Sequence, residues 1–147
     1  MKYGIDINSE KILSFISEKL KGEGSFIIDF TEKNNKNNGR ALLKKVLIAN
    51  VTNIDFYFAI EFKNDISFAE ILYDEHYCSK VFAQKLVDLL ESKFINIVCK
   101  IDNHLYLIKN IEAPVVYVSF PMNDKEEIEN LLIDNKVIDI LMGIKIW

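Results

Sequence analysis

The sequence predicts an α/β domain with a single central sheet, mostly parallel or mixed, of about five or six strands with helices on both faces. Two observations predict this class. Short apolar segments alternate with segments whose apolar residues recur at helical spacing, and half of the 147 residues are hydrophobic. Neither a linker nor an internal repeat divides the chain, and its length suits one unit. We therefore expect a single domain over residues 1–147.

The first three predicted elements are a strand, a helix and a second strand. The first strand covers residues 2–7, and Asn8 and Ser9 follow it as candidate N-caps for a helix with regularly spaced apolar residues. The segment KGEG ends this helix, and residues 25–30 form the second strand. The polar stretch EKNNKNNG at 32–39 is predicted to be a surface loop.

The middle of the chain continues the alternation of helix and strand. Residues 40–52 suit a second helix. The continuous apolar run at 53–62 is typical of a strand that is buried in the middle of a sheet. Another strand is predicted at 68–73, and a third helix with one apolar face is predicted at 77–93.

The last third begins with two short segments, 96–101 and 104–110, which are predicted to be strands or turns. Residues 114–120 form the last buried strand. The segment NDKEEIENLL then begins a helix with a capping box between Asn123 and Glu126. Apolar residues continue at helical spacing after it, towards the C-terminus.

Composition excludes several classes of function. The net charge is -4, and Arg40 is the only arginine, so nothing favours binding to a nucleic acid backbone. No apolar run is long enough for a signal peptide or a membrane span, so we expect a cytoplasmic protein. Cys78 and Cys99 lie far apart without a CxxC motif, and we interpret them as reduced packing residues.

Five segments, in the same order along the chain, resemble those of the zinc-dependent N-acetylmuramoyl-L-alanine amidases, including endolysin catalytic domains. The terminal helix pair also corresponds; no single segment is specific, but together with this pair they cover nearly the whole chain. The segments are LKKVLIAN at 43–50 with Lys45 in place of an arginine, NIDFYFAIEFKN at 53–64, FAEILY at 68–73 with Glu70 at a recurrent glutamate, SKVFAQKLVDLLES at 79–92 and LYLIKNIEAPVVYV at 105–118.

The resemblance implies a zinc ion held by two histidines and a glutamate, with a water in the open position. The loop that carries the first histidine in the family is missing here, since IDINSE passes directly from strand to helix. Glu10 matches the ligand glutamate, although an acidic residue is also favourable in the first turn of any helix. Glu61 stands where the family has its second histidine. We therefore expect no zinc, with Mg²⁺ as the alternative for two carboxylates.

The catalytic glutamate of the family falls at Ser119, or at Val118 in a shifted register, and neither side chain is a general base at neutral pH. Ser119 would need an activating base to act as a nucleophile. A trio of Ser119, His104 and Asp102 is one alternative, but His76 and His104 both have the sequence context of surface turns.

These substitutions predict a catalytically inactive amidase-like domain without a cofactor. Its strand ends would retain a cleft, lined by Glu10, Glu61, Lys63 and Ser119, that binds a peptidoglycan fragment or a protein partner. One alternative is a divergent active cell-wall amidase with an atypical site. Another is a structural or interaction module, with a homodimer formed through the apolar segment VIDILMGIKIW at 137–147.

Overall fold

A computed structural model describes residues 1–32, 39–93 and 96–144 of the chain. It contains one six-stranded sheet with the strand order β2-β1-β3-β6-β4-β5. The described elements are β1 (Lys2–Ile7), α1 (Glu10–Gly22), β2 (Phe26–Asp29), α2 (Gly39–Val51), β3 (Phe56–Lys63), β4 (Ala69–Tyr73), α3 (Tyr77–Leu90), β5 (Ile97–Ile101), α4 (Tyr106–Asn110), β6 (Val115–Pro121), the 3₁₀ turn η1 (Met122–Asp124), α5 (Lys125–Leu132) and α6 (Asn135–Met142).

The sheet is mixed because one pair of neighbouring strands is antiparallel. Strands β2, β1, β3 and β6 are joined by parallel pairings, and β4 pairs with β6 in the antiparallel sense and with β5 in parallel. The C-terminal end of β4 therefore lies beside the N-terminal end of β6. The predicted α/β class, with a single sheet of mixed direction, is confirmed.

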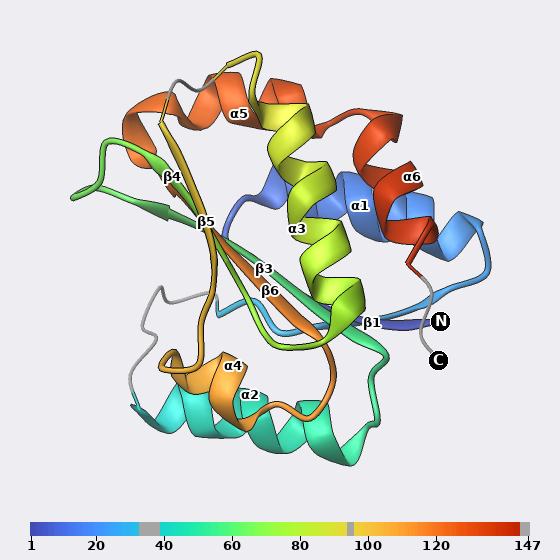
Figure 1. The fold of residues 1–147 in the computed structure, drawn as a ribbon. Helices are drawn as coiled ribbons and strands as arrows, with labels where there is room; N and C mark the ends of the chain where they lie inside the picture. The colour runs from blue at the N-terminus through green and yellow to red at the C-terminus, as the bar shows by residue number, and fades with distance from the viewer. Residues whose placement is uncertain (33–38, 94–95, 145–147) are drawn as a thin grey trace.

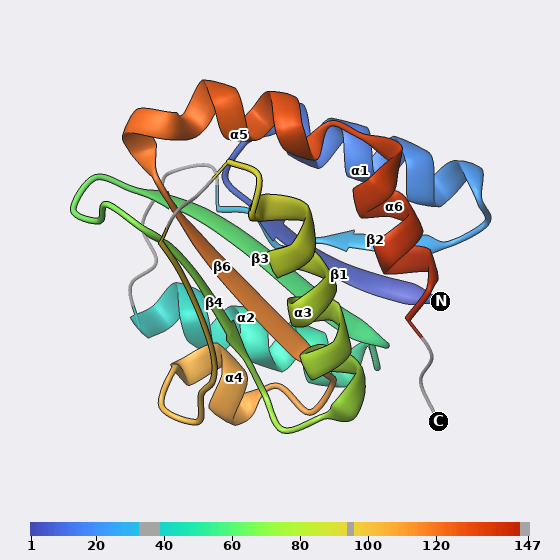
Figure 2. The ribbon, with the colours of Figure 1, turned by 45° about the horizontal axis from the view of Figure 1, so that its top comes forward.

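Helices cover both faces of this sheet (Figures 1 and 2). Helices α1, α3, α5 and α6 lie on one face, and α2 and α4 lie on the other. Successive side chains of a strand point to opposite faces. Thus Phe58 and Val118 belong to the first core, whereas Tyr57, Ala59 and Tyr117 belong to the core under α2 and α4. This alternation decides which polar side chains can meet at the strand ends.

The short connection from β1 to α1 is fixed by the side chain of Ser9. Ser9 is the N-cap of α1, where its hydroxyl accepts a hydrogen bond from the backbone N–H of Ile12 (3.4 Å), as the sequence predicts. The same hydroxyl donates to the buried carboxylate of Glu129 in α5. The first and fifth helices are thereby tied together at the edge where β1 ends.

Two predicted elements differ from the structure. Residues 104–110 contain the helix α4 and no strand, because the Asp102 carboxylate accepts hydrogen bonds from the backbone N–H groups of His104 and Leu105 and turns the chain. The predicted capping box of Asn123 is also wrong. Asn123 lies inside the 3₁₀ turn, and α5 begins after Asp124, which makes no side-chain cap hydrogen bond.

Most of the predicted surface loop at 32–39 lies outside the described residues. Among the helices that the structure describes, none has the length and apolar character needed to cross a membrane.

Candidate functional site

Three residues that the resemblance singled out lie in one row across the sheet. Glu61 of β3 pairs with Ser119 of β6, and Ser119 pairs on its other side with Glu70 of β4. All three side chains point to the face of α2 and α4, because Ala59, Tyr117 and Leu72, each two residues away on the same strand, pack in that core. The row lies near the C-terminal ends of β3 and β6, where ligands of α/β sheets usually bind.

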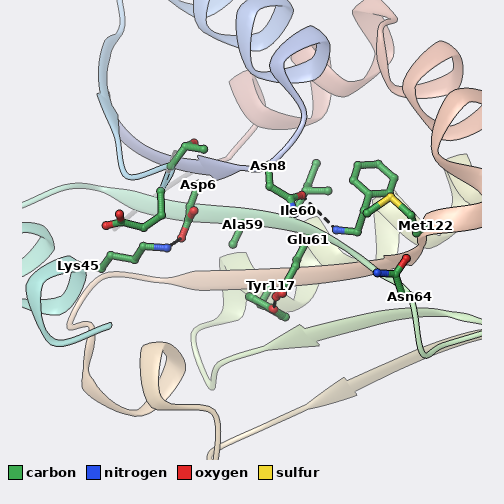
Figure 3. Close-up of a pocket in the computed structure, with 12 residues that line it drawn as sticks. Asp6, Asn8, Lys45, Ala59, Ile60, Glu61, Asn64, Tyr117 and Met122 are labelled. Carbon is green, nitrogen blue, oxygen red and sulfur yellow. Dashed lines mark hydrogen bonds and ion pairs between the residues drawn. The ribbon is translucent and has the colours of Figure 1, made fainter. Parts of the chain in front are cut away.

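A cavity of about 220 Å³ opens beside this row (Figure 3). Ala59 lines the cavity, and it pairs with Asp6 on β1 and with Tyr117 on β6. Because its side chain is small, it leaves space between the two larger ones. The side chains around the cavity are mainly polar. They include Asp6, Asn8, Thr31, Glu32, Lys45, Glu61 and Asn64.

The carboxylate of Glu61 is engaged by a neighbouring tyrosine. The Tyr117 hydroxyl donates a hydrogen bond to Oε2 of Glu61. The ammonium of Lys63 lies 5.6 Å from the centre of the Tyr117 ring, a distance at which a cation is attracted to the ring face. Glu61 is thus held at the cavity wall by groups of the protein itself.

Asp6, on the other side of Ala59, has two partners. Its Oδ2 accepts a hydrogen bond from the Tyr57 hydroxyl (2.6 Å) and forms a salt bridge with the buried ammonium of Lys45 (2.9 Å; Figure 3). Burial raises the pKa of Tyr57 far above its usual value, and the negative charge of Asp6 and its hydrogen bond raise it further. Tyr57 therefore remains a proton donor to Asp6, and Lys45 compensates the charge of Asp6.

The predicted site residues are not all brought together at this cavity. Glu61 lines it, whereas Glu10, Lys63 and Ser119 do not. Glu10 opens α1, a helix that covers the opposite face of the sheet, and its side chain is exposed. Ser119 is only 1% exposed, and its hydroxyl has no hydrogen-bond partner among the described residues. Val118 points into the other core.

The two histidines of the chain lie at the other end of the strands from Glu61, where β4 and β5 end and β6 begins. Nδ1 of His76 is 2.8 Å from Oδ2 of Asp74, and that carboxylate also accepts a hydrogen bond from the backbone N–H of Val115 at the start of β6. Val115 and Ser119 are separated by four strand residues, or about 13 Å. An imidazole at this end of the strands therefore does not reach the carboxylate of Glu61.

His104 lies at the same end of the strands as His76, in the turn after β5. There the Asp102 carboxylate accepts hydrogen bonds from the backbone N–H groups of His104 and Leu105. The backbone N–H of Asp102 in turn donates to Tyr73 O, opposite the start of β6. Asp102 thus bonds to the backbone of the turn, and the Ser119 hydroxyl has no partner within the part of the chain that the structure describes, so these residues do not form the trio of Ser119, His104 and Asp102.

The residues at the strand ends do not fit a catalytic zinc. Such a site needs three protein ligands, of which the resembled family supplies two as imidazoles. No group of three or more His, Cys, Asp and Glu side chains in the described part of the chain is placed to hold a metal ion. The undescribed positions 33–38, 94–95 and 145–147 contain only Lys, Asn, Phe, Ile and Trp. The described residues thus bring no imidazole beside the carboxylate of Glu61.

Both cysteines are free and lie away from the cavity. Burial raises the pKa of the Cys99 thiol, and burial followed by the nearby charge of Asp74 raises that of Cys78. A raised pKa makes a thiol less reactive, since the thiolate is the nucleophile and metal ligand. Neither cysteine therefore has the environment of a redox or nucleophilic centre.

The sequence interpretation missed the two tyrosine–carboxylate bonds that hold the carboxylates of the cavity, from Tyr57 to Asp6 and from Tyr117 to Glu61. The signal was present in the alternation along the strands, because Tyr57 and Glu61 of β3 are an even number of residues apart and share a face. The partners Asp6 and Tyr117 come from strands far away in sequence. Their pairing requires the order β1-β3-β6, which the alternation alone does not give.

Several solved structures are similar to this one, although no family model and no curated protein matches the chain. The catalytic domain of the CD27L endolysin targeting Clostridia difficile superposes with a TM-score of 0.73 at 17% identity, covering 95% of this chain and 97% of that one. The catalytic domain of CwlV, an N-acetylmuramoyl-L-alanine amidase from Bacillus (Paenibacillus) polymyxa var. colistinus, gives a TM-score of 0.70 at 12% identity, covering 99% and 100%.

A third similar structure is that of the CwlD amidase from Clostridioides difficile in complex with the GerS lipoprotein. It has a TM-score of 0.62 and 16% identity, and the match covers 97% of this chain and 95% of that one. In each case nearly the whole of both chains takes part. The chain therefore has the fold of the N-acetylmuramoyl-L-alanine amidases and endolysin catalytic domains, as its segments predict.

Proposed function

We propose that this chain is a non-hydrolytic domain with the amidase fold, and that it binds a small polar fragment of peptidoglycan in the cavity beside Glu61. The observation that carries the proposal is the placement of the histidines. Both histidines lie at the end of the strands opposite to Glu61. The carboxylates at the cavity are bonded to groups of the protein, namely Tyr117, Tyr57 and Lys45. A histidine-ligated zinc would need imidazoles beside Glu61, so the position of the two histidines supports a domain without zinc-dependent hydrolysis.

The cavity offers groups that suit a ligand rich in amides and hydroxyls. Asn64 is exposed at its rim, and Asn8 presents an amide whose Oδ1 accepts a hydrogen bond from the backbone N–H of Phe62 (3.1 Å). The Thr31 hydroxyl at the rim donates to the carbonyl of Ile7 (3.2 Å) and accepts from its N–H (3.1 Å), so towards a ligand it can act only as an acceptor. Ligand pockets usually measure about 300–1,000 Å³. A cavity of about 220 Å³ is smaller, so it would enclose one end of a muropeptide and leave the rest in solvent.

Titration of the purified chain with muropeptides, followed by calorimetry or NMR, tests the proposal. Replacing Ala59 with Leu fills the floor of the cavity and should abolish binding, and Asn64→Ala should weaken it about five- to tenfold through the lost hydrogen bond. Asn103→Ala, an exposed change at the opposite edge of the sheet, is the matched control and should bind like the wild type. Binding that survives Ala59→Leu unchanged would exclude this cavity as the site.

A protein partner is the second candidate function. The observation that favours it is the complex of the CwlD amidase with the GerS lipoprotein, in which a protein of this fold assembles with another protein. A divergent active amidase is the third, and it would release stem peptides from cell walls in the same preparations that are used for binding. Binding without release supports the non-hydrolytic domain over the divergent enzyme.

A further inference from the structure

Helix α2 is apolar on both of its sides, but the fold covers only one of them. Val46 and Ala49 are buried against the sheet. On the outward side Leu43, Leu47 and Val51 are 47%, 55% and 78% exposed, and their spacing of four residues aligns them in a stripe about 12 Å long. A helix that is hydrophobic all round is normally covered all round. The stripe therefore indicates a surface that something else covers.

Basic residues and an exposed tyrosine accompany this stripe. Arg40 and Lys44 are exposed on α2, and the neighbouring helix α4 exposes Tyr106 and Lys109. Both helices form the layer on one face of the sheet (Figures 1 and 2). We call the outward side of this layer the α2–α4 surface; it consists of Leu43, Leu47, Val51, Tyr106, Arg40, Lys44 and Lys109.

The α2–α4 surface has a charge that differs from that of the whole chain. Neither helix contains Asp or Glu, although the chain has 22 acidic residues and a net charge of -4. Each helix of the opposite layer carries at least one acidic residue, the set being Glu10, Glu18, Asp88, Glu126, Glu127, Glu129 and Asp139. These carboxylates lie beyond the sheet, whereas the exposed Glu112, which follows α4, lies at the end of α2 and offsets part of the positive charge. Charges separated by more than a Debye length of about 8 Å are largely screened at physiological ionic strength.

We propose that the α2–α4 surface binds to an anionic lipid surface, with α2 lying in the plane of the membrane. The charge complementarity favours this partner, because lysine and arginine near an anionic bilayer each contribute about 1 kcal/mol, a factor of about five in affinity. Aliphatic side chains beside basic ones on one helix face are typical of helices that lie in the lipid interface, and tyrosine is enriched at that depth.

The fold holds α2 firmly enough to present this surface as a unit. The salt bridge of Lys45 with Asp6 attaches the helix to β1. Asn50 donates to the backbone carbonyl of Asn110 (3.0 Å) and accepts a hydrogen bond from the backbone N–H of Glu112 (2.9 Å). These bonds join the end of α2 to the segment after α4, so the stripe and Tyr106 belong to one rigid layer.

Flotation of the full chain with lipid vesicles tests the proposal. The chain should float with vesicles of phosphatidylglycerol and phosphatidylcholine, and should bind at least tenfold more weakly to vesicles of phosphatidylcholine alone. Leu47→Gln should reduce binding at least fivefold, and the double variant Arg40→Gln with Lys44→Gln at least tenfold. The matched controls are Tyr77→Gln, an exposed apolar residue on α3, and Lys11→Gln with Lys19→Gln on α1, which changes the net charge by the same amount.

Three results would overturn the proposal. The first is a wild-type chain that binds neither kind of vesicle at low salt. The second is binding that the control variants reduce as much as the α2 variants do. The third is a concentration-dependent dimer in light scattering that Leu47→Gln dissociates, without vesicle binding, since this would assign the surface to a second copy of the chain. Circular dichroism and urea unfolding of each variant separate loss of binding from loss of the fold.

Discussion

Ser119 of β6 lies directly opposite Glu61 of β3 in the parallel register, and its buried hydroxyl has no hydrogen-bond partner among the described residues. By the resemblance, Glu61 stands at a zinc-binding histidine of the family, and Ser119 stands at the catalytic glutamate unless the register is shifted to Val118. Here one is a carboxylate that accepts a hydrogen bond from Tyr117, and the other is a small polar side chain on the sheet. Neither side chain is therefore the group that the resemblance predicts at its position.

Because the Ser119 hydroxyl has no hydrogen-bond partner among the residues that the structure describes, removing this hydroxyl should not destabilise the fold. A buried polar group without a partner costs about 1–3 kcal/mol of desolvation. Ser119→Ala should therefore leave the free energy of unfolding unchanged or raise it by up to about 1 kcal/mol, as measured by urea denaturation. Ser9→Ala is the contrasting variant, because Ser9 caps α1 and donates to Glu129, and it should lose about 1–3 kcal/mol. A clear loss of stability in Ser119→Ala would show that its hydroxyl has a partner.

The salt bridge between Lys45 and Asp6 predicts a large difference between two adjacent lysines. Lys45→Met leaves the mostly buried carboxylate of Asp6 without its cation and should reduce the free energy of unfolding by about 3–5 kcal/mol. Lys44→Met, an exposed change one residue away, should alter it by less than about 0.5 kcal/mol. Adding Asp6→Asn to Lys45→Met should restore much of the loss. Equal effects of the two lysine variants would refute a structural role for this pair.

Tyr3 predicts how the stability changes at alkaline pH. Burial, followed by the charge of Asp55, raises the pKa of Tyr3 from 10.0 to about 12. The folded state holds this proton more tightly than the unfolded state. The contribution of protonated Tyr3 to the free energy of unfolding is therefore complete below pH 10 and is lost as the pH rises towards 12. In that window Tyr3 should account for a decline of about 1.4 kcal/mol per pH unit. Urea unfolding from pH 9 to 11.5 should show this part of the decline in the wild type and not in Tyr3→Phe.

Tyr77→Phe, on an exposed residue, is the control and should retain the wild-type decline. The hydrogen bond from the Tyr3 hydroxyl to the carbonyl of Leu141 (2.9 Å) is lost in Tyr3→Phe at every pH. That loss lowers the whole curve of this variant without changing its slope below pH 10. An unchanged alkaline slope in Tyr3→Phe would mean that Tyr3 ionises equally easily in both states.

Local patterns in the sequence predict most of the fold. The strand at 2–7, the Ser9 cap and the apolar run before Lys63 are each set by residues close to one another in the chain, and each is confirmed. The secondary structure of the segment at 104–110 is harder to predict from the sequence, because its apolar residues suit either a strand or a turn of helix. The carboxylate of Asp102 decides between them by bonding to the backbone of the following residues.

The site is only partly predictable, since its geometry depends on which strands are neighbours. The structure pairs Glu61 with Ser119 across β3 and β6, and the order of the resembling segments does not by itself give this pairing. The partners of the carboxylates, Tyr117 for Glu61 and Lys45 for Asp6, come from elements more than thirty residues away, and only the folded sheet brings them together. Likewise, nothing local shows that Glu10 opens a helix on the opposite face from Glu61.

The zinc content and activity of the purified chain test the central claim most directly. Protein from a zinc-supplemented culture, purified without chelator, should contain far less than one zinc ion per chain by elemental analysis and should release no stem peptide from isolated cell walls. A zinc ion bound in equal amount to the chain, lost in Glu61→Gln together with release of such peptides, would contradict the account.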